Sequence, residues 1–274
     1  MRRLRKLDAN ADIQGMCCNA QADELFLADW GNRAVRATRV RANAGADDVR
    51  HVYRGSAHDT SPAVYSVCHM RDSDTLLVCS YERGQDYKNA NWLVALSRRG
   101  GGDEWRETHR LQTEHPATIC CALSDSRVLI GKHSSEYLQQ FRVQSGPRIA
   151  DEQRIRVPEK YEWLSATCGS GGETHVAMSF EKDQSVRVFR LVGDRLDERA
   201  RIQLESPYQL LWLAARLFVG VSGGNGVVEL ALSGKRLERR AQLKAVRVNE
   251  WCALDDGVVV YNAKSKELLH YSLT

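Results

Sequence analysis

Two glutamates and an asparagine are the side chains of this sequence best suited to hold a hard cation. Glu162, Asn249 and Glu250 supply the carboxylate and amide oxygens that such cations prefer. All three lie where a predicted strand begins, at comparable places in the repeat pattern described below. An ordinary polar rim of surface carboxylates is the simpler interpretation of the same residues. We therefore predict no bound metal and no cofactor.

The motifs of nucleophilic and phosphate chemistry do not accompany these carboxylates. Gly169-Ser170-Gly171 lacks the strand-turn-helix setting of a nucleophile elbow, and Ser222-Gly223-Gly224 is typical of a hairpin turn. The sequence contains no glycine-rich phosphate loop. We predict that the chain is not an enzyme and has no catalytic residue.

Aromatic side chains near the same strand beginnings point to a binding surface instead. Large aromatic residues anchor protein interfaces, and loops on a rigid scaffold present them. We predict a monomeric scaffold that recognises a protein or peptide, with no membrane contact. The predicted partner-binding residues are Tyr65, Glu162, Trp163, Gln209, Glu250 and Trp251. Packing in the core is an equally good interpretation of each aromatic residue.

Arginines crowd the first sixty residues and raise single-stranded RNA as an alternative ligand. Arg33, Arg36 and Arg39 would contact phosphates, and Trp30 would stack on a base. The chain has 39 Lys and Arg against 35 Asp and Glu, a net charge of only +4, so the total implies no large electrostatic footprint. A solvent-exposed basic strand explains the same arginines.

The eight cysteines favour free, buried thiols that act as small apolar side chains. No Cys-x-x-Cys pair and no zinc-finger spacing is present, and the chain lacks an Asn-x-Ser/Thr acceptor. We predict no disulfide and a reducing, cytoplasmic location. The residues are Cys17, Cys18, Cys68, Cys79, Cys120, Cys121, Cys168 and Cys252.

A repeating pattern of short apolar strands must position all of these residues. Six such runs centre on Met16, Val67, Cys120, Ala166, Leu211 and Cys252, at steps of 51, 53, 46, 45 and 41 residues. Each step is about the length of one four-stranded propeller blade, and further strand-like runs follow each centre. We predict an all-β fold, a six-bladed β-propeller of four-stranded antiparallel blades.

The predicted propeller is a single domain over residues 1–274 without a linker. Its sixth repeat ends before a fourth strand, and Arg2-Arg3-Leu4-Arg5-Lys6-Leu7 has the character of the missing one. We predict that the N-terminal strand completes the last blade and removes its exposed edge. A basic leader or targeting segment is the alternative. The predicted blades are residues 12–57, 62–115, 116–160, 161–206, 207–247, and 248–274 with 1–8.

Two local features complete these expectations. The N-terminus has no apolar signal-peptide core, and no apolar run is long enough to span a membrane. In the second blade, Tyr81 to Asn91 is a polar insertion that we expect to form a mobile arm over one face.

The hairpin Leu25 to Arg36, which contains Ala-Asp-Trp-Gly-Asn-Arg, resembles the middle hairpin of an NHL repeat and more distantly the YWTD repeat. Weaker echoes lie at Gly223 to Val228 and at Tyr261 to Lys264. Both families build six-bladed propellers, and some NHL domains bind single-stranded RNA. A further resemblance, to six-bladed lactonases, implies a metal-dependent hydrolase as a second alternative, with Glu162, Asn249 and Glu250 near the metal. The Gly-His and Trp-Asp pairs of WD40 repeats and the regular diglycines of kelch repeats are absent.

Overall fold

The structure is a computed structural model, and it assigns the chain to two compact units. The first contains Met1–Cys120, Arg142–Ala150 and Asn249–Thr274, and the second contains Cys121–Phe141 and Asp151–Val248. The structure describes residues 2–19, 21, 23–40, 49–54, 63–70, 73–83, 89–98, 104–115, 117–124, 126–144, 148–168, 172–213, 215–222, 226–243, 250–254 and 256–272.

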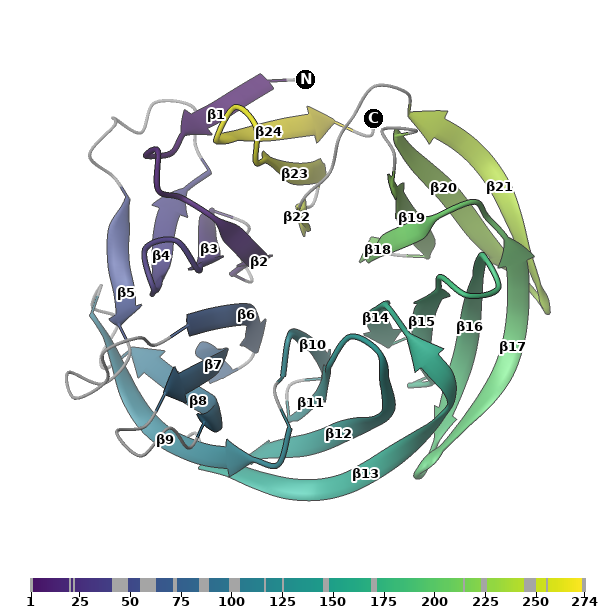
Figure 1. The fold of residues 1–274 in the computed structure, drawn as a ribbon, viewed down its shortest axis with the longest axis horizontal. Helices are drawn as coiled ribbons and strands as arrows, with labels where there is room; N and C mark the ends of the chain where they lie inside the picture. Colours follow the sequence, from purple (N-terminus) through teal and green to yellow (C-terminus); the bar gives the residue numbers. More distant parts are fainter. Residues whose placement is uncertain are drawn as a thin grey trace. The chain divides into compact units, whose positions relative to one another are not determined.

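The described residues form six four-stranded antiparallel sheets (Figure 1). Three sheets lie in the first unit. They are β1 (Arg2–Lys6) with β24 (Glu267–Ser272), β23 (Gly257–Asn262) and β22 (Glu250–Leu254); β2 (Ile13–Cys18), β3 (Glu24–Asp29), β4 (Ala34–Arg39) and β5 (Arg50–Arg54); and β6 (Ala63–Met70), β7 (Thr75–Arg83), β8 (Asn89–Arg98) and β9 (Trp105–Thr113).

The other three sheets follow in chain order. One is β10 (Ile119–Ser124), β11 (Arg127–Gly131), β12 (Ser135–Gln144) and β13 (Arg148–Tyr161), whose strands contribute residues to both units. The second unit holds β14 (Trp163–Cys168), β15 (Thr174–Phe180), β16 (Ser185–Val192) and β17 (Arg195–Gln203), and also β18 (Pro207–Leu213), β19 (Arg216–Val221), β20 (Gly226–Ser233) and β21 (Arg236–Leu243). The predicted fold class, a six-bladed β-propeller, is confirmed.

The N-terminal strand completes the last blade, as the missing fourth strand predicted. β1 pairs antiparallel with β24, with Arg2 opposite His270 and Lys6 opposite Glu267 (Figure 1). Immediately after β1, the Leu7 amide donates a hydrogen bond to the Lys266 carbonyl at 2.7 Å. The first and last strands of the chain therefore belong to one hydrogen-bonded sheet.

A left-handed residue recurs in the turn between the second and third strands of several blades. Arg33, Ser134, Gln184 and Lys266 have φ values of 52°, 60°, 54° and 56°. Each immediately precedes the first residue of the third strand, so four blades place a left-handed residue at the same point of this turn despite different residue types. Side chains with a Cβ pay a modest cost in this region, which the flanking strand pairs must offset.

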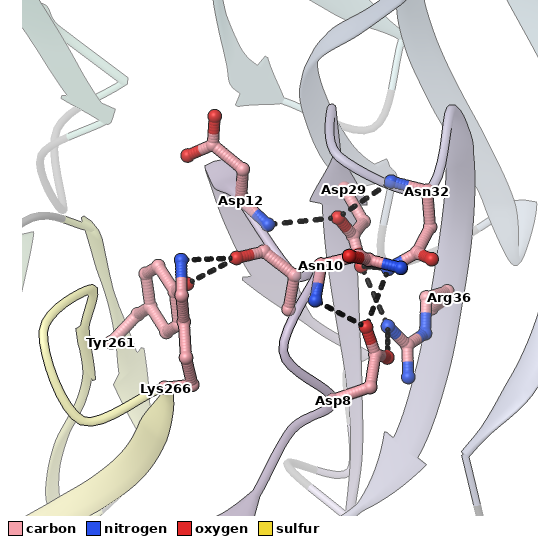
Figure 2. A network of polar contacts seen from close by, with 9 residues as sticks. Asp8, Asn10, Asp12, Asp29, Asn32, Arg36, Tyr261 and Lys266 are labelled. Atoms are coloured by element: carbon pink, nitrogen blue, oxygen red, sulfur yellow. Dashed lines mark hydrogen bonds and ion pairs between the residues drawn. The ribbon is translucent and has the colours of Figure 1, made fainter.

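In the first blade, this hairpin carries a buried ion network (Figure 2). The Asp29 carboxylate, whose side chain is 0% exposed, accepts from Arg36 Nη1 at 2.7 Å and from Asn32 Nδ2 at 2.8 Å. It also accepts from the backbone amides of Asp12 and Asn32, at 3.0 and 3.2 Å. The same Arg36 nitrogen lies 2.6 Å from Asp8 Oδ2. Every part of the buried charge is thus matched by a donor.

The network fixes the segment that joins β1 to β2. Tyr261 Oη and Lys266 Nζ, both from the last blade, donate to the Ala11 carbonyl at 2.8 and 2.7 Å (Figure 2). A Cβ at Gly31 would lie 1.7 Å from the Asn10 carbonyl oxygen, so the turn passes this segment at a distance that only glycine allows. Burial acts to raise the Asp8 pKa, but hydrogen bonds from Asn32 and Arg36 outweigh it and leave that pKa below its ordinary value.

The core of each unit consists of apolar side chains packed between sheets. In the first unit, Leu7, Ile13, Leu27, Tyr261 and Leu268 belong to one buried cluster, which joins the last blade to the first. A second cluster joins the first and second blades around Phe26 and Trp105, and a third lies within the second unit around Trp212. Because the alternate residues of these strands point to the core, the apolar periodicity of the sequence predicted them well.

Two local expectations change. β13 runs from Arg148 to Tyr161, so the outer strand of the third blade ends one residue past the predicted boundary at residue 160. The expected arm at Tyr81 to Asn91 is in large part a continuation of the hairpin, because Tyr81 pairs with Asn91 and Arg83 with Asn89. Residues 84–88 of that arm lie outside the described residues. The longer hairpin is favoured because its paired strands satisfy backbone N–H and C=O groups with one another, whereas a loop would leave these groups to water.

Removing Met1 to Leu7 will strongly destabilise the protein. The deletion leaves β24 without its neighbour and takes Leu7 from a buried cluster. Several backbone hydrogen bonds worth about 1 kcal/mol each, together with lost apolar burial, amount to roughly 5 kcal/mol. We expect the melting temperature to fall by about 10 °C or more.

Arg3→Ala is the matched control for this deletion. It removes only the ion pair with Glu267, in which the Arg3 side chain is 66% exposed, and should leave the melting temperature almost unchanged. A truncated protein that melts within two degrees of the intact one would show that β1 does not complete the last blade in solution.

Candidate functional site: an arginine-lined pocket

A polar pocket of about 360 Å³ opens at one end of the first and second blades. Strand ends build it: Glu24 begins β3, Arg39 ends β4, Arg50 begins β5 and Arg98 ends β8. Glu24 and Arg39 face one another in the strand register. Asn19, Gln21 and Asp23 complete the lining. The antiparallel pairing of these strands therefore brings distant residues to one edge.

Glu24 organises two of the arginines. Its carboxylate pairs with Arg50 Nη2 through one oxygen and with Arg98 Nη2 through the other. The Glu24 side chain is only 9% exposed, so its charge needs these partners. One carboxylate between two guanidinium groups leaves an excess of positive charge and holds both cations in place.

Arg98 is the most constrained of the arginines. Its guanidinium lies over the Trp105 ring, 4.4 Å from the centroid, and its Nε is 3.6 Å from Asp74 Oδ2. Asp74 in turn lies 3.0 Å from Nε2 of His69, whose side chain is 1% exposed. Burial, the first cause, and the charge of Arg98 lower the His69 pKa, whereas Asp74 and Glu24 act to raise it; the pKa remains below its ordinary value.

Arg39 differs from its neighbours in the pocket. Within the described part of the chain, its side chain takes part in none of the hydrogen bonds or ion pairs, and the residue is exposed. A guanidinium group carries five donors in a planar fork that matches a carboxylate or a phosphate. The pocket thus presents one uncommitted cation beside two that are held in position.

The charges of the pocket favour an anion. Arg39, Arg50 and Arg98 contribute three positive charges, and Asp23 and Glu24 contribute two negative charges, so the lining has a net charge of +1. The Asn19 and Gln21 amides add neutral hydrogen-bonding groups. Such a site attracts an oxyanion electrostatically and can satisfy its oxygens with directed N–H groups.

Three of the predicted partner-binding residues are at least partly accessible. Tyr65 lies in the first unit between Trp30 and Tyr81, with centroid distances of 4.8 and 6.5 Å. Trp163 lies in the second unit beside His133 and Tyr208, at 4.9 and 5.5 Å. Glu162, next to it, accepts a hydrogen bond from Ser134 Oγ at 3.3 Å. Their role in binding stays a prediction.

The other three predicted partner-binding residues are buried. Gln209, Glu250 and Trp251 are 0%, 7% and 5% exposed, so they are not surface anchors. Glu250 and Trp251 begin β22 and pair with Tyr261 and Val260, which explains their burial. The core interpretation of Trp251 is the one that holds, because an inner-strand residue faces its neighbours.

The predicted RNA-binding residues do not form one surface. Trp30 and Arg33 lie at the turn between β3 and β4, whereas Arg39 lies at the far end of β4. Arg36 is buried and paired with Asp8 and Asp29. These arginines are close in sequence, but Arg33 and Arg39 lie at opposite ends of the hairpin and Arg36 is buried between them.

The predicted cation ligands are divided between the two units and the undescribed part of the chain. Glu162 and Glu250 belong to different units, and Asn249 lies outside the described residues. Among the residues that the structure does describe, no group of three or more His, Cys, Asp or Glu is arranged to hold a metal ion.

Sequence reasoning missed Glu24 and Arg98. They are 74 positions apart, and neither belongs to a motif. The sequence offered only their positions: Glu24 begins one strand and Arg98 ends another, each at the strand end far from the hairpin turn. Charged residues at the ends of adjacent strands meet when the strands belong to neighbouring blades.

Comparisons with known proteins identify a fold and no family. No protein-family model matches the chain, and no curated protein matches it in sequence. Membership of the NHL family therefore stays a prediction.

Solved structures resemble the chain over almost its whole length. Virginiamycin B lyase from Staphylococcus aureus has a TM-score of 0.58 and 8% identity, covering 100% of this chain and 99% of that one. The soluble aldose sugar dehydrogenase from Escherichia coli has a TM-score of 0.67 and 9% identity, covering 98% of both. A chain of the mitotic checkpoint complex has a TM-score of 0.63 and 12% identity, covering 99% and 91%. At these identities the likeness shows the fold alone.

These structures correct the functional prediction. A non-enzymatic module for protein or peptide recognition was expected because no catalytic motif stands out, with RNA binding and lactonase chemistry as alternatives. The similar structures include a lyase and a sugar dehydrogenase, so the fold is one that enzymes use and the prediction is wrong. The expectation that the chain is not an enzyme has no support.

Two findings concern the partners and the location of the protein. One similar structure belongs to a multi-protein complex, so the fold is compatible with protein partners. The part of the chain that the structure describes contains no helix suited to crossing a membrane. Cytoplasmic location and the monomeric state stay predictions.

Acid will destabilise the protein partly through His69. Its pKa is lowered in the folded state, so the unfolded chain binds more protons below the ordinary histidine pKa of about 6.5. Stability is therefore complete above that pH and declines as the pH falls through the folded-state value. Urea unfolding at pH 7.5 and pH 5.5 should show a decrease, with a slope of at most about 1.4 kcal/mol per pH unit for this residue.

The variant His69→Gln should show a smaller decrease between the two pH values. His51 and His133 also have lowered pKa values, chiefly because of burial, and will retain the rest of the dependence. An unchanged or steeper pH dependence in His69→Gln would contradict the assignment of this residue.

Proposed function

We propose that the protein binds a small anionic ligand, a carboxylate or a phosphate, in the arginine-lined pocket. The observation that carries this proposal is the guanidinium of Arg39, which pairs with no acid among the described residues and lies beside Arg50 and Arg98 at a pocket of about 360 Å³. Small-molecule sites are typically about 300 to 1,000 Å³, so the size suits a metabolite better than a polymer.

Pre-organisation supports the same function. Glu24 holds Arg50 and Arg98, and Trp105 supports the Arg98 guanidinium from below. A ligand therefore meets cations whose side-chain freedom is already reduced, which lowers the entropy cost of binding. Arg39 supplies a positive charge that no acid among the described residues matches.

The scaffold adds to this argument. The pocket residues lie at the ends of paired strands, and such positions move less than loop tips. Glu24 also distinguishes the site from a plain basic patch, because a buried acid that pairs with both Arg50 and Arg98 fixes the positions of their guanidinium groups. A directed site of this kind selects an oxyanion by geometry as well as by charge.

Calorimetric titration tests the proposal with defined probes: inorganic phosphate, citrate and glucose 6-phosphate, each at constant ionic strength. We expect at least one to bind, with affinity that falls as salt rises. Arg39→Ala removes a charged donor worth about 1.5 to 3 kcal/mol and should weaken binding roughly 10- to 100-fold.

Arg33→Ala is the matched control, because it removes an exposed arginine from the other end of the same hairpin and changes the net charge equally. It should leave the affinity nearly unchanged. Absence of binding by all three probes, or equal loss in the two variants, would refute a directed anion site.

A further inference from the structure

We propose that Cys68 and Cys120 are a redox-active pair that forms a reversible disulfide when a peroxide acts as the oxidant. Both thiols are free and buried, and their sulfur atoms lie 2.8 Å apart. Cys68 lies on β6 and Cys120 on β10, both within the first unit. This pairing is independent of the anion pocket.

The backbone holds the two cysteines in place. The Cys120 amide donates to Ser66 Oγ at 3.1 Å, two residues from Cys68 on the same strand. A disulfide bond is about 2.05 Å long, so the two sulfur atoms need to approach by less than about 1 Å. The hydrogen bond from Cys120 to Ser66 links the two strands beside the pair.

Further thiols surround the pair. Cys79, on β7, also hydrogen-bonds the Cys120 thiol, and Cys17, on β2, lies close enough to Cys68 to interact electrostatically. The sequence predicted inert buried thiols, each acting as a small apolar side chain. The structure instead brings Cys17, Cys68, Cys79 and Cys120 together. Direct contact between two sulfur atoms is what distinguishes a reactive pair from thiols that merely pack as apolar groups.

The chemistry balances with hydrogen peroxide. The Cys68 thiol loses its proton and the thiolate attacks one peroxide oxygen; the O–O bond breaks, and the leaving hydroxide takes up that proton as the first water, which leaves Cys68 as a sulfenic acid. The Cys120 sulfur then attacks the Cys68 sulfur, the S–O bond breaks, and the Cys120 proton leaves with the hydroxide as water. Two thiols and one peroxide give one disulfide and two waters, and a thiol reductant reverses the change.

Burial sets the pace of this reaction. It raises the Cys120 pKa well above the ordinary value, so Cys120 is protonated at neutral pH and must lose its proton as it attacks, which slows the second step. Cys68 and Cys120 are 5% and 8% exposed, which admits a small peroxide more readily than a bulky reagent. The pair should therefore respond to sustained oxidation more than to a brief pulse.

Peptide mapping of the full-length protein tests the proposal. After treatment with hydrogen peroxide and alkylation in denaturant, non-reducing mass spectrometry should find a peptide joined through Cys68 and Cys120. The number of alkylated thiols should fall from eight to six and recover with dithiothreitol. Closing a loop across 52 positions should raise the melting temperature of the oxidised protein by roughly 5 °C or more.

Two variants sharpen this test. Cys168→Ser removes an exposed thiol of the second unit and should leave the disulfide intact, whereas Cys120→Ser should abolish it. The wild-type map decides the question even where Cys120→Ser folds poorly. Eight alkylatable thiols after oxidation, oxidation confined to Cys168, or a bridge from Cys120 to Cys79 would each overturn the proposal.

Discussion

The buried carboxylate of Asp29 is the charge on which the first blade and its junction with the last blade depend. It has no contact with water, and four donors surround it: Arg36, the Asn32 side chain, and the Asp12 and Asn32 amides. Arg36 also pairs with Asp8, immediately beyond β1. Because an unpaired buried charge costs several kcal/mol, the segment between β1 and β2 is held against the β3–β4 hairpin.

A similar arginine paired with two acids occurs in the fourth blade. Arg187 on β16 pairs with Asp183 in the preceding turn and with Glu159 on β13, the latter at 2.8 Å. Gln184, one position after Asp183, has the left-handed φ that Arg33 has after Asn32. In both blades, an arginine on the third strand binds an acid in its own hairpin and an acid in the segment that precedes the blade. Binding an acid from the preceding segment orients that segment relative to the hairpin.

Periodicity predicted the strands, but these pairings needed the structure. The unbroken apolar run from Leu25 to Ala28 identifies a strand from local sequence, since a strand that is buried on both faces requires apolar residues throughout. Asn32 and Asp183 occupy corresponding turn positions, each directly before a residue with left-handed φ. The sequence does not show this correspondence, because the two residue types differ. Arg36 was interpreted as a surface arginine, because burial of a charge depends on Asp8, 28 positions away.

The proposed ligand site uses the other end of the same hairpin. β3 and β4 run from the Asp29 turn to Glu24 and Arg39, so one end is locked by ion pairs and the other opens to the pocket. This arrangement gives the pocket a rigid support. Neighbouring arginines on one strand therefore differ: Arg36 is paired with Asp8 and Asp29, whereas the Arg39 side chain pairs with no acid among the residues that the structure describes.

Hydrogen exchange of the β1 and β24 amides in Arg36→Met tests most directly whether the Asp29 network secures the N-terminal strand. The substitution keeps side-chain length and leaves Asp29 without its cation. We predict that these amides exchange at least about tenfold faster than in the wild type, whereas those of β15 and β16 keep their rates and Arg33→Met changes neither. Unchanged β1 exchange, or equal acceleration throughout the chain, would contradict the account.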